Sequence, residues 1–64
     1  MSTSPGSIVT NGSKVGRVCR EEAQLIEVCV WLNPTAQPSE RQVVTEMWQK
    51  SEASPHAGPA PACP

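Results

Sequence analysis

The stretch Arg17–Asn33, RVCREEAQLIEVCVWLN, decides the fold, because it has the clearest apolar spacing in the chain. Its apolar residues recur at helical intervals in two neighbouring rows: Cys19, Ala23, Ile26 and Val30, with Val18, Leu25, Cys29 and Leu32 beside them. This spacing predicts an amphipathic helix, which Asn33-Pro34 ends because a residue before proline leaves the α region. The alternative is a strand over Leu25–Leu32, where β-branched residues are frequent. The helix is favoured because the polar residues keep a helical period.

A second helix is expected after a short connection. Ser39 and Gln42 fit a capping box, and the residues that follow it, to about Lys50, form one apolar face: Val43, Val44, Met47 and Trp48. A short connection makes two helices antiparallel. The sequence therefore predicts a mostly α fold, a two-helix hairpin over residues 17–50.

The segments on either side of this hairpin are expected to lack fixed structure. Residues 1–16 contain the stretch IVTNGSKV, whose Asn11-Gly12 pair favours a type I′ turn that pairs Val9 with Lys14. With only two tryptophans as aromatics in 64 residues, the core is thin. We therefore interpret residues 1–16 as a flexible arm with a possible turn. Residues 51–64, SEASPHAGPAPACP, are read as a disordered tail rich in Pro and Ala.

Charge and hydropathy exclude several function classes. The net charge is −1 without a basic stripe, which argues against nucleic-acid binding. The longest apolar run, Val28–Leu32, is far below the roughly 20 residues of a membrane span. The first residues, MSTSPGSIV, do not resemble a signal peptide. The expected location is therefore intracellular, in cytoplasm or nucleus, and not secreted, with the three cysteines as reduced thiols.

No catalytic, cofactor or metal site is expected. His56 is the only histidine, and the cysteines lack the close pairs of zinc modules. The spacing of Cys19 and Cys29 resembles one half of the twin Cys-x9-Cys proteins of the mitochondrial intermembrane space. That resemblance implies helices joined by disulfides and a cysteine-linked import substrate, but the second expected helix has no cysteine. On one helix these two residues would lie about 15 Å apart, too far to bridge, so both are interpreted as small core residues.

The run Glu21–Trp48 also resembles the first two helices of homeodomains, through a Gln-Leu start, an Asn-Pro stretch and a Pro-x-x-Arg entry into the second helix. The third helix, which reads the major groove, and the basic N-terminal arm are missing. The resemblance therefore does not imply specific DNA binding.

The expected function is that of a small non-enzymatic interaction module. It would dock an apolar helical face on a protein partner or on a second copy of itself. The expected partner-binding residues are Leu25, Val28, Trp31, Leu32, Met47 and Trp48. The alternative is a truncated or chance reading-frame product without a stable fold or evolved function.

Overall fold

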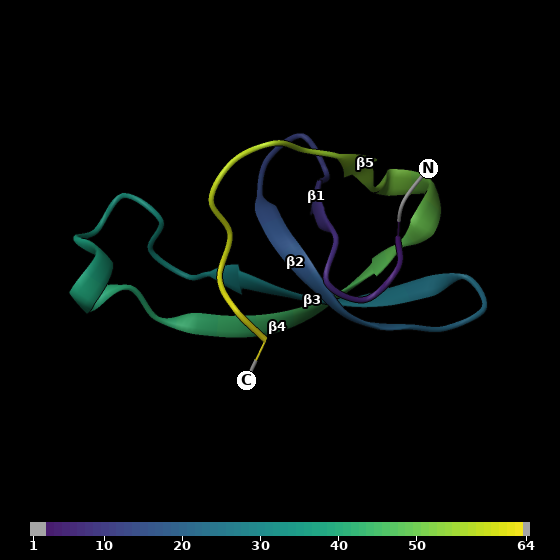
Figure 1. Cartoon of the computed structure of the whole chain (residues 1–64), viewed down its shortest axis with the longest axis horizontal. Helices are drawn as coiled ribbons and strands as arrows, with labels where there is room; N and C mark the ends of the chain where they lie inside the picture. The colour runs from purple at the N-terminus through teal and green to yellow at the C-terminus, as the bar shows by residue number, and fades with distance from the viewer. Residues whose placement is uncertain (1–2, 64) are drawn as a thin grey trace.

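Five antiparallel strands form one sheet in the computed structural model, which describes residues 3–63. The strands follow one another along the chain as β1 (Ile8–Thr10), β2 (Val15–Glu21), β3 (Leu25–Trp31), β4 (Val43–Gln49) and β5 (Ser54–Pro55). Their order across the sheet is β4-β3-β2-β1-β5, so β1 to β4 form a meander and β5 returns to pair with β1 (Figure 1).

The expected two-helix hairpin over residues 17–50 is wrong. The helices among the described residues are two single 3₁₀ turns, at Pro38–Glu40 and Lys50–Glu52. The alternative prediction of a strand over Leu25–Leu32 is the correct one, since β3 spans Leu25–Trp31. β-Branched side chains pack well on a pleated surface, and here they occupy every second position of β3, which a helix would spread around its axis.

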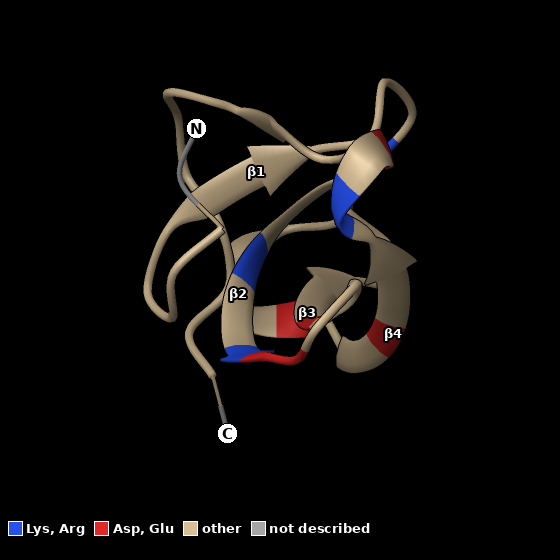
Figure 2. Ribbon diagram, turned by 90° about the vertical axis from the view of Figure 1, so that its right-hand side faces the viewer, with Lys and Arg blue, Asp and Glu red and all other residues tan. Residues whose placement is uncertain are grey.

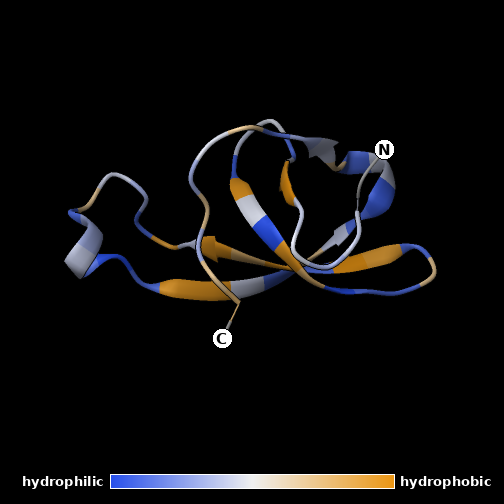
Figure 3. Cartoon of the chain, viewed as in Figure 1, coloured by the Kyte–Doolittle hydropathy of each residue, from blue (hydrophilic) through white to orange (hydrophobic). Residues whose placement is uncertain are grey.

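The core lies on one face of the sheet, which we call the inner face. Buried side chains alternate along the strands: Val9, Val18, Ile26, Val28, Val30, Trp48 and, after β4, Ala53. Figure 3 shows the corresponding mixture of apolar and polar positions along β2 and β3. This period of two places the remaining residues of each strand on the opposite, outer face.

The inner face has one close approach that requires glycine. A Cβ atom at Gly16 would lie 2.3 Å from Cγ1 of Val28, 2.6 Å from the carbonyl oxygen of Cys29 and 2.7 Å from Cγ1 of Val30. Such distances are shorter than van der Waals contact, so any larger residue would push β2 away from β3.

The N-terminal arm is part of the sheet. Val9 is fully buried, and β1 pairs with β2 in the register Val9 to Gly16, not Val9 to Lys14. The loop therefore has four residues, Asn11 to Lys14, in which Gly12 has a φ of +95° and Asn11 does not have a positive φ. A type I′ turn needs positive φ at both positions. The sequence therefore predicted the turn at Asn11-Gly12 correctly, but the predicted type I′ geometry is wrong.

The Pro-rich tail is also ordered where it is described. Ser54 and Pro55 pair with β1, Pro61 is buried, and the segment then sweeps back over the strands (Figure 1). The predictions for residues 1, 2 and 64 lie outside the described part. The expected capping box is wrong as well: Ser39 lies inside the first 3₁₀ turn, which has no side-chain cap. Asn33 Oδ1 instead accepts the Gln42 N–H at 2.8 Å.

Candidate functional site

The expected partner-binding residues divide between the core and the surface. Val28 and Trp48 point into the inner face and are buried, so they cannot meet a partner in this fold. Leu25 and Met47 belong to the outer face and are exposed. Whether any of these residues binds a partner remains a prediction.

Trp31 and Leu32 line a separate groove. It has a volume of about 500 Å³, and its walls come from the β1–β2 loop, the end of β3 and the C-terminal segment: Ser13, Lys14, Val15, Trp31, Leu32, Pro34, His56 and Pro59. The guanidinium of Arg41 lies 4.4 Å from the centre of the Trp31 ring, a cation–π distance. This contact covers part of the Trp31 side chain, which is half-buried.

Strand β4 leaves its outer backbone edge unpaired. The Leu32 N–H donates to Gln42 O at 2.8 Å, and the Lys50 N–H donates to Gln24 O at 3.0 Å. Hydrogen-bonded pairs alternate along an antiparallel ladder, so the even-numbered residues of β4 bond to β3. The odd-numbered residues direct their N–H and C=O groups away from the sheet, where no described strand lies: Val43, Thr45, Met47 and Gln49.

Two of these four odd-numbered residues carry exposed apolar side chains. Val43 and Met47 are 45% and 48% exposed, and Leu25 of the neighbouring strand is 37% exposed. Glu46 is the only charged residue within β4, and its register opposite Val28 assigns it to the inner face; Figure 2 shows the acidic position on β4. It accepts hydrogen bonds from Lys14 Nζ at 2.6 Å and Trp48 Nε1 at 3.0 Å. Both hydrogen bonds lower the pKa of the Glu46 carboxyl, and the bond from Lys14 has the larger effect.

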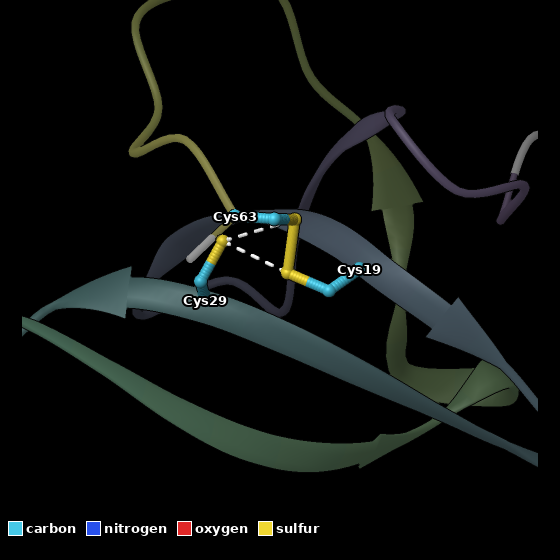
Figure 4. Close-up of side chains that lie close together, drawn as sticks. All are labelled: Cys19, Cys29 and Cys63. Carbon is cyan, nitrogen blue, oxygen red and sulfur yellow. Dashed lines mark hydrogen bonds between the residues drawn. A yellow bond between two sulfur atoms is a disulfide. The ribbon is translucent and has the colours of Figure 1, made fainter.

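A second feature of the outer face is a cluster of three cysteines from three segments. Cys29 lies on β3 opposite Arg17, and Cys19 lies on β2 at a β-bulge between Val18 and Arg20. Cys63 comes from the segment after β5 (Figure 4). The bulge inserts one unpaired residue into β2, and that residue is Cys19.

The three sulfur atoms are in mutual contact. Cys19 and Cys63 form a disulfide, with their Cα atoms 5.7 Å apart, and Cys29 is a buried free thiol. The Cys29 Sγ lies 3.2 Å from the Cys19 Sγ and 3.5 Å from the Cys63 Sγ (Figure 4). The expectation of three reduced thiols therefore differs from this structure, in which one thiol remains.

The sulfurs form a triangle and not a line. Thiol–disulfide exchange proceeds by attack of a thiolate on one sulfur of the disulfide, along the axis of the bond that breaks. For in-line attack, the Cys29 Sγ and both disulfide sulfurs would lie on one line. The distances from Cys29 to the two disulfide sulfurs would then differ by a whole S–S bond, about 2 Å. The two distances differ by much less, so the thiol faces the side of the disulfide. This arrangement is suited to shared coordination more than to exchange.

Polar groups surround the cluster. The carbonyl oxygen of Arg17 lies 3.4 Å from the Cys29 Sγ, and that of Pro61 lies 3.8 Å from it. The Arg17 guanidinium donates from Nε to Pro61 O at 2.9 Å and from Nη1 to Gly6 O at 3.2 Å. Arg17 thus holds the C-terminal segment over the cysteines and brings a positive charge close to them.

Sequence reasoning missed this cluster because it placed Cys19 and Cys29 on one helix. On a β2–β3 hairpin the same two residues become cross-strand neighbours. The alternative strand over Leu25–Leu32 was the signal in the sequence that could have indicated this. The contribution of Cys63 has no local sequence signal.

Comparison with known proteins gives no match: no family model, no curated protein and no solved structure is similar to this chain. Among the described residues, none of the helices is long and apolar enough to cross a membrane.

Proposed function

We propose that the protein is a non-enzymatic interaction module that self-associates through the free edge of β4. The observation that carries this proposal is the unpaired backbone of β4, whose outward-facing residues also carry exposed apolar side chains. An exposed edge strand offers a row of hydrogen-bond donors and acceptors to another strand.

The two edges of the sheet differ in how they are protected. Strand β5 has two residues, and one of them is Pro55, so it offers little to a further strand. Strand β4 has seven residues, contains neither proline nor lysine, and pairs with β3 without a bulge. Short length and proline therefore protect the β5 edge, whereas β4 has only one inward-facing charge, that of Glu46, to blunt its edge.

One register of self-pairing fits the side chains. In a twofold antiparallel pair centred on Thr45, Val43 of one copy lies opposite Met47 of the other, and the two Thr45 residues face each other. Apolar and Thr–Thr cross-strand pairs are favourable. A register centred on Glu46 would place two carboxylates opposite each other, which is unfavourable. Twofold pairing uses the same surface on both copies and closes as a dimer.

The partner is inferred to be protein, a second copy of the chain, because the net charge of −1 does not suit a nucleic acid, and Figure 2 shows both basic and acidic positions on the ribbon. An intracellular location belongs to this proposal too. In such a compartment glutathione would also reduce the Cys19–Cys63 disulfide, so that all three cysteines would be thiols.

Sedimentation equilibrium across a hundredfold concentration range tests the proposal. Thr45→Lys would put two ammonium groups opposite each other, and because like charges at an interface cost several kcal/mol, the dimer Kd should rise at least about tenfold. Thr35→Lys, the same change at an exposed position in the β3–β4 loop, is the matched control and should leave the Kd unchanged.

Circular dichroism with a thermal melt accompanies these measurements. Equal dissociation constants for the two lysine variants would contradict pairing through β4. A coil-like spectrum without a cooperative melt would instead favour the alternative of a chance product without a stable fold.

A further inference from the structure

The three cysteine sulfurs lie within 4.8 Å of one another, although they come from β2, β3 and the C-terminal segment. Cys29 is buried, Cys19 is half-buried and Cys63 is exposed. Thiolates are ligands that select soft or borderline metal ions such as Zn²⁺ and Cu⁺. The fold therefore assembles a soft-ligand set that the sequence spacing does not indicate.

We infer that Cys19, Cys29 and Cys63, after reduction of the disulfide, bind one thiophilic divalent metal ion of the Zn²⁺ class. This inference concerns the outer face over β2 and β3 and is independent of the proposed pairing through β4.

The chemistry needs a two-electron reductant, either a thiol or a phosphine, and a phosphine acts by becoming its oxide with the oxygen of one water molecule. Two monothiols, or one dithiol, reduce the Cys19–Cys63 bond: the reductant becomes a disulfide, and its two protons pass to the two cysteine sulfurs. Metal binding then replaces three S–H bonds by three S–metal bonds and releases three protons. A disulfide oxidant reverses the sequence: it is reduced to two thiols, the Cys19–Cys63 bond forms again, and the metal is released because the bonded sulfurs no longer carry thiolate charge. The site is thus open to metal only in the reduced protein.

The required movements are small. Zn–S bonds of about 2.3 Å in a tetrahedral site place the ligating sulfurs about 3.8 Å apart. The Cys29 Sγ already lies 3.2 Å and 3.5 Å from its two neighbours. The sulfurs of Cys19 and Cys63 must separate from bonding distance to the same spacing. Cys63 can provide this movement because it is exposed and belongs to an irregular segment.

The surroundings suit a metal–thiolate centre. Three thiolates and one divalent ion leave a net charge of −1, and the Arg17 guanidinium, which is anchored to Pro61 O and Gly6 O, offsets it. These hydrogen bonds go to backbone carbonyls, so Arg17 acts through its charge and by holding the segment that carries Cys63. His56 lines the groove beside Trp31 instead of the cluster. The fourth position is therefore left to a solvent molecule or an added ligand, which reaches the site on the exposed side of Cys63.

Metal titration of the full chain provides the test. The protein is reduced with a phosphine, which does not bind Zn²⁺ tightly, and titrated with Cd²⁺ while the ultraviolet thiolate-to-metal charge-transfer band is recorded. Competition with Zn²⁺ then gives its affinity. We expect one ion per chain, a band in the reduced protein and none in the oxidised protein.

Single substitutions assign the ligands. In the reduced state, Cys63→Ser changes an exposed residue and should lower the Zn²⁺ affinity at least about 100-fold, since even the loss of an outer-shell partner costs 10–100-fold. His56→Ala is the matched control, because it removes the only imidazole, and it should leave the affinity unchanged. Arg17→Leu should weaken binding less than Cys63→Ser does.

Three results would overturn the inference: absence of a charge-transfer band in the reduced protein, equal affinity of Cys63→Ser and the reduced wild type, or a loss of affinity in His56→Ala. Circular dichroism of each reduced variant establishes that the comparison is made between folded proteins.

Discussion

The Cys19–Cys63 disulfide closes most of the chain into one loop, and its reduction should strongly destabilise the fold. The two residues are separated by 44 positions. The chain-entropy model gives a loss of roughly 13 cal/mol/K for a loop of this length, or about 4 kcal/mol at 25 °C. At roughly 0.05–0.15 kcal/mol per residue, a chain of this size has a total stability of only about 3–10 kcal/mol. The cross-link therefore accounts for a large share of the stability.

Urea unfolding of the oxidised and reduced wild type, with a chelator present to exclude metal, measures this share. The expected loss of about 4 kcal/mol corresponds to a fall in Tm of roughly 15–30 °C, at 4–8 °C per kcal/mol for a small domain. Cys63→Ser, kept reduced so that Cys19 and Cys29 do not pair, should unfold like the reduced wild type. A difference below about 1 kcal/mol between the oxidised and reduced protein would refute the argument that the disulfide restrains the unfolded chain.

Three further predictions concern the scaffold. Gly16→Ala should cost about 1–3 kcal/mol in urea unfolding because its Cβ would overlap the Cys29 carbonyl oxygen, and the loss should exceed that of Gly12→Ala, which has open space and only its positive φ against it. Asn11→Ala should cost about 1 kcal/mol, because the Asn11 Oδ1 accepts the N–H groups of Ser13 and Lys14; an unchanged Tm would show that the loop does not need them. The pKa of the Glu46 carboxyl lies below its usual 4.5, so its contribution to the free energy of unfolding is present above pH 4.5 and is lost as the pH falls through the pKa of the folded state. Urea midpoints of Glu46→Gln should lack this acid dependence, and pH profiles identical to those of the wild type would contradict it.

The sequence could predict the local elements better than their arrangement. The Asn11-Gly12 turn was visible, and the strand over Leu25–Leu32 was a stated alternative. Ile26, Val28 and Val30 occur at a spacing of two, but Ile26 and Val30 also fall within one helical row, and periodicity alone does not separate helix from strand in a short apolar run. The pairing of β3 with β2 and β4 made the difference, and this is tertiary information.

Prediction of the surface features depended on the same choice between helix and strand. The expected docking residues Leu25 and Met47 are exposed in either fold, whereas Val28 and Trp48 change from a helix face to the core of the sheet. The free edge of β4 has no counterpart in a helical hairpin. The three-cysteine cluster needs the β2–β3 hairpin and the return of a segment rich in Pro and Ala, for which local periodicity has no signature.

The bulge at Cys19 implies that the scaffold and the cysteine cluster can be separated by a single-residue deletion. On one side of it Val18 faces Val28, and on the other side Arg20 faces Glu27. Removing Cys19 would make Val18 and Arg20 consecutive, and the two ladders would join in one continuous register without turning any core side chain outward. A chain one residue shorter would keep the strand register but lose the cluster and, with the Cys19–Cys63 disulfide, about 4 kcal/mol of stability. The extra residue serves the sulfur chemistry and not the pairing of the strands.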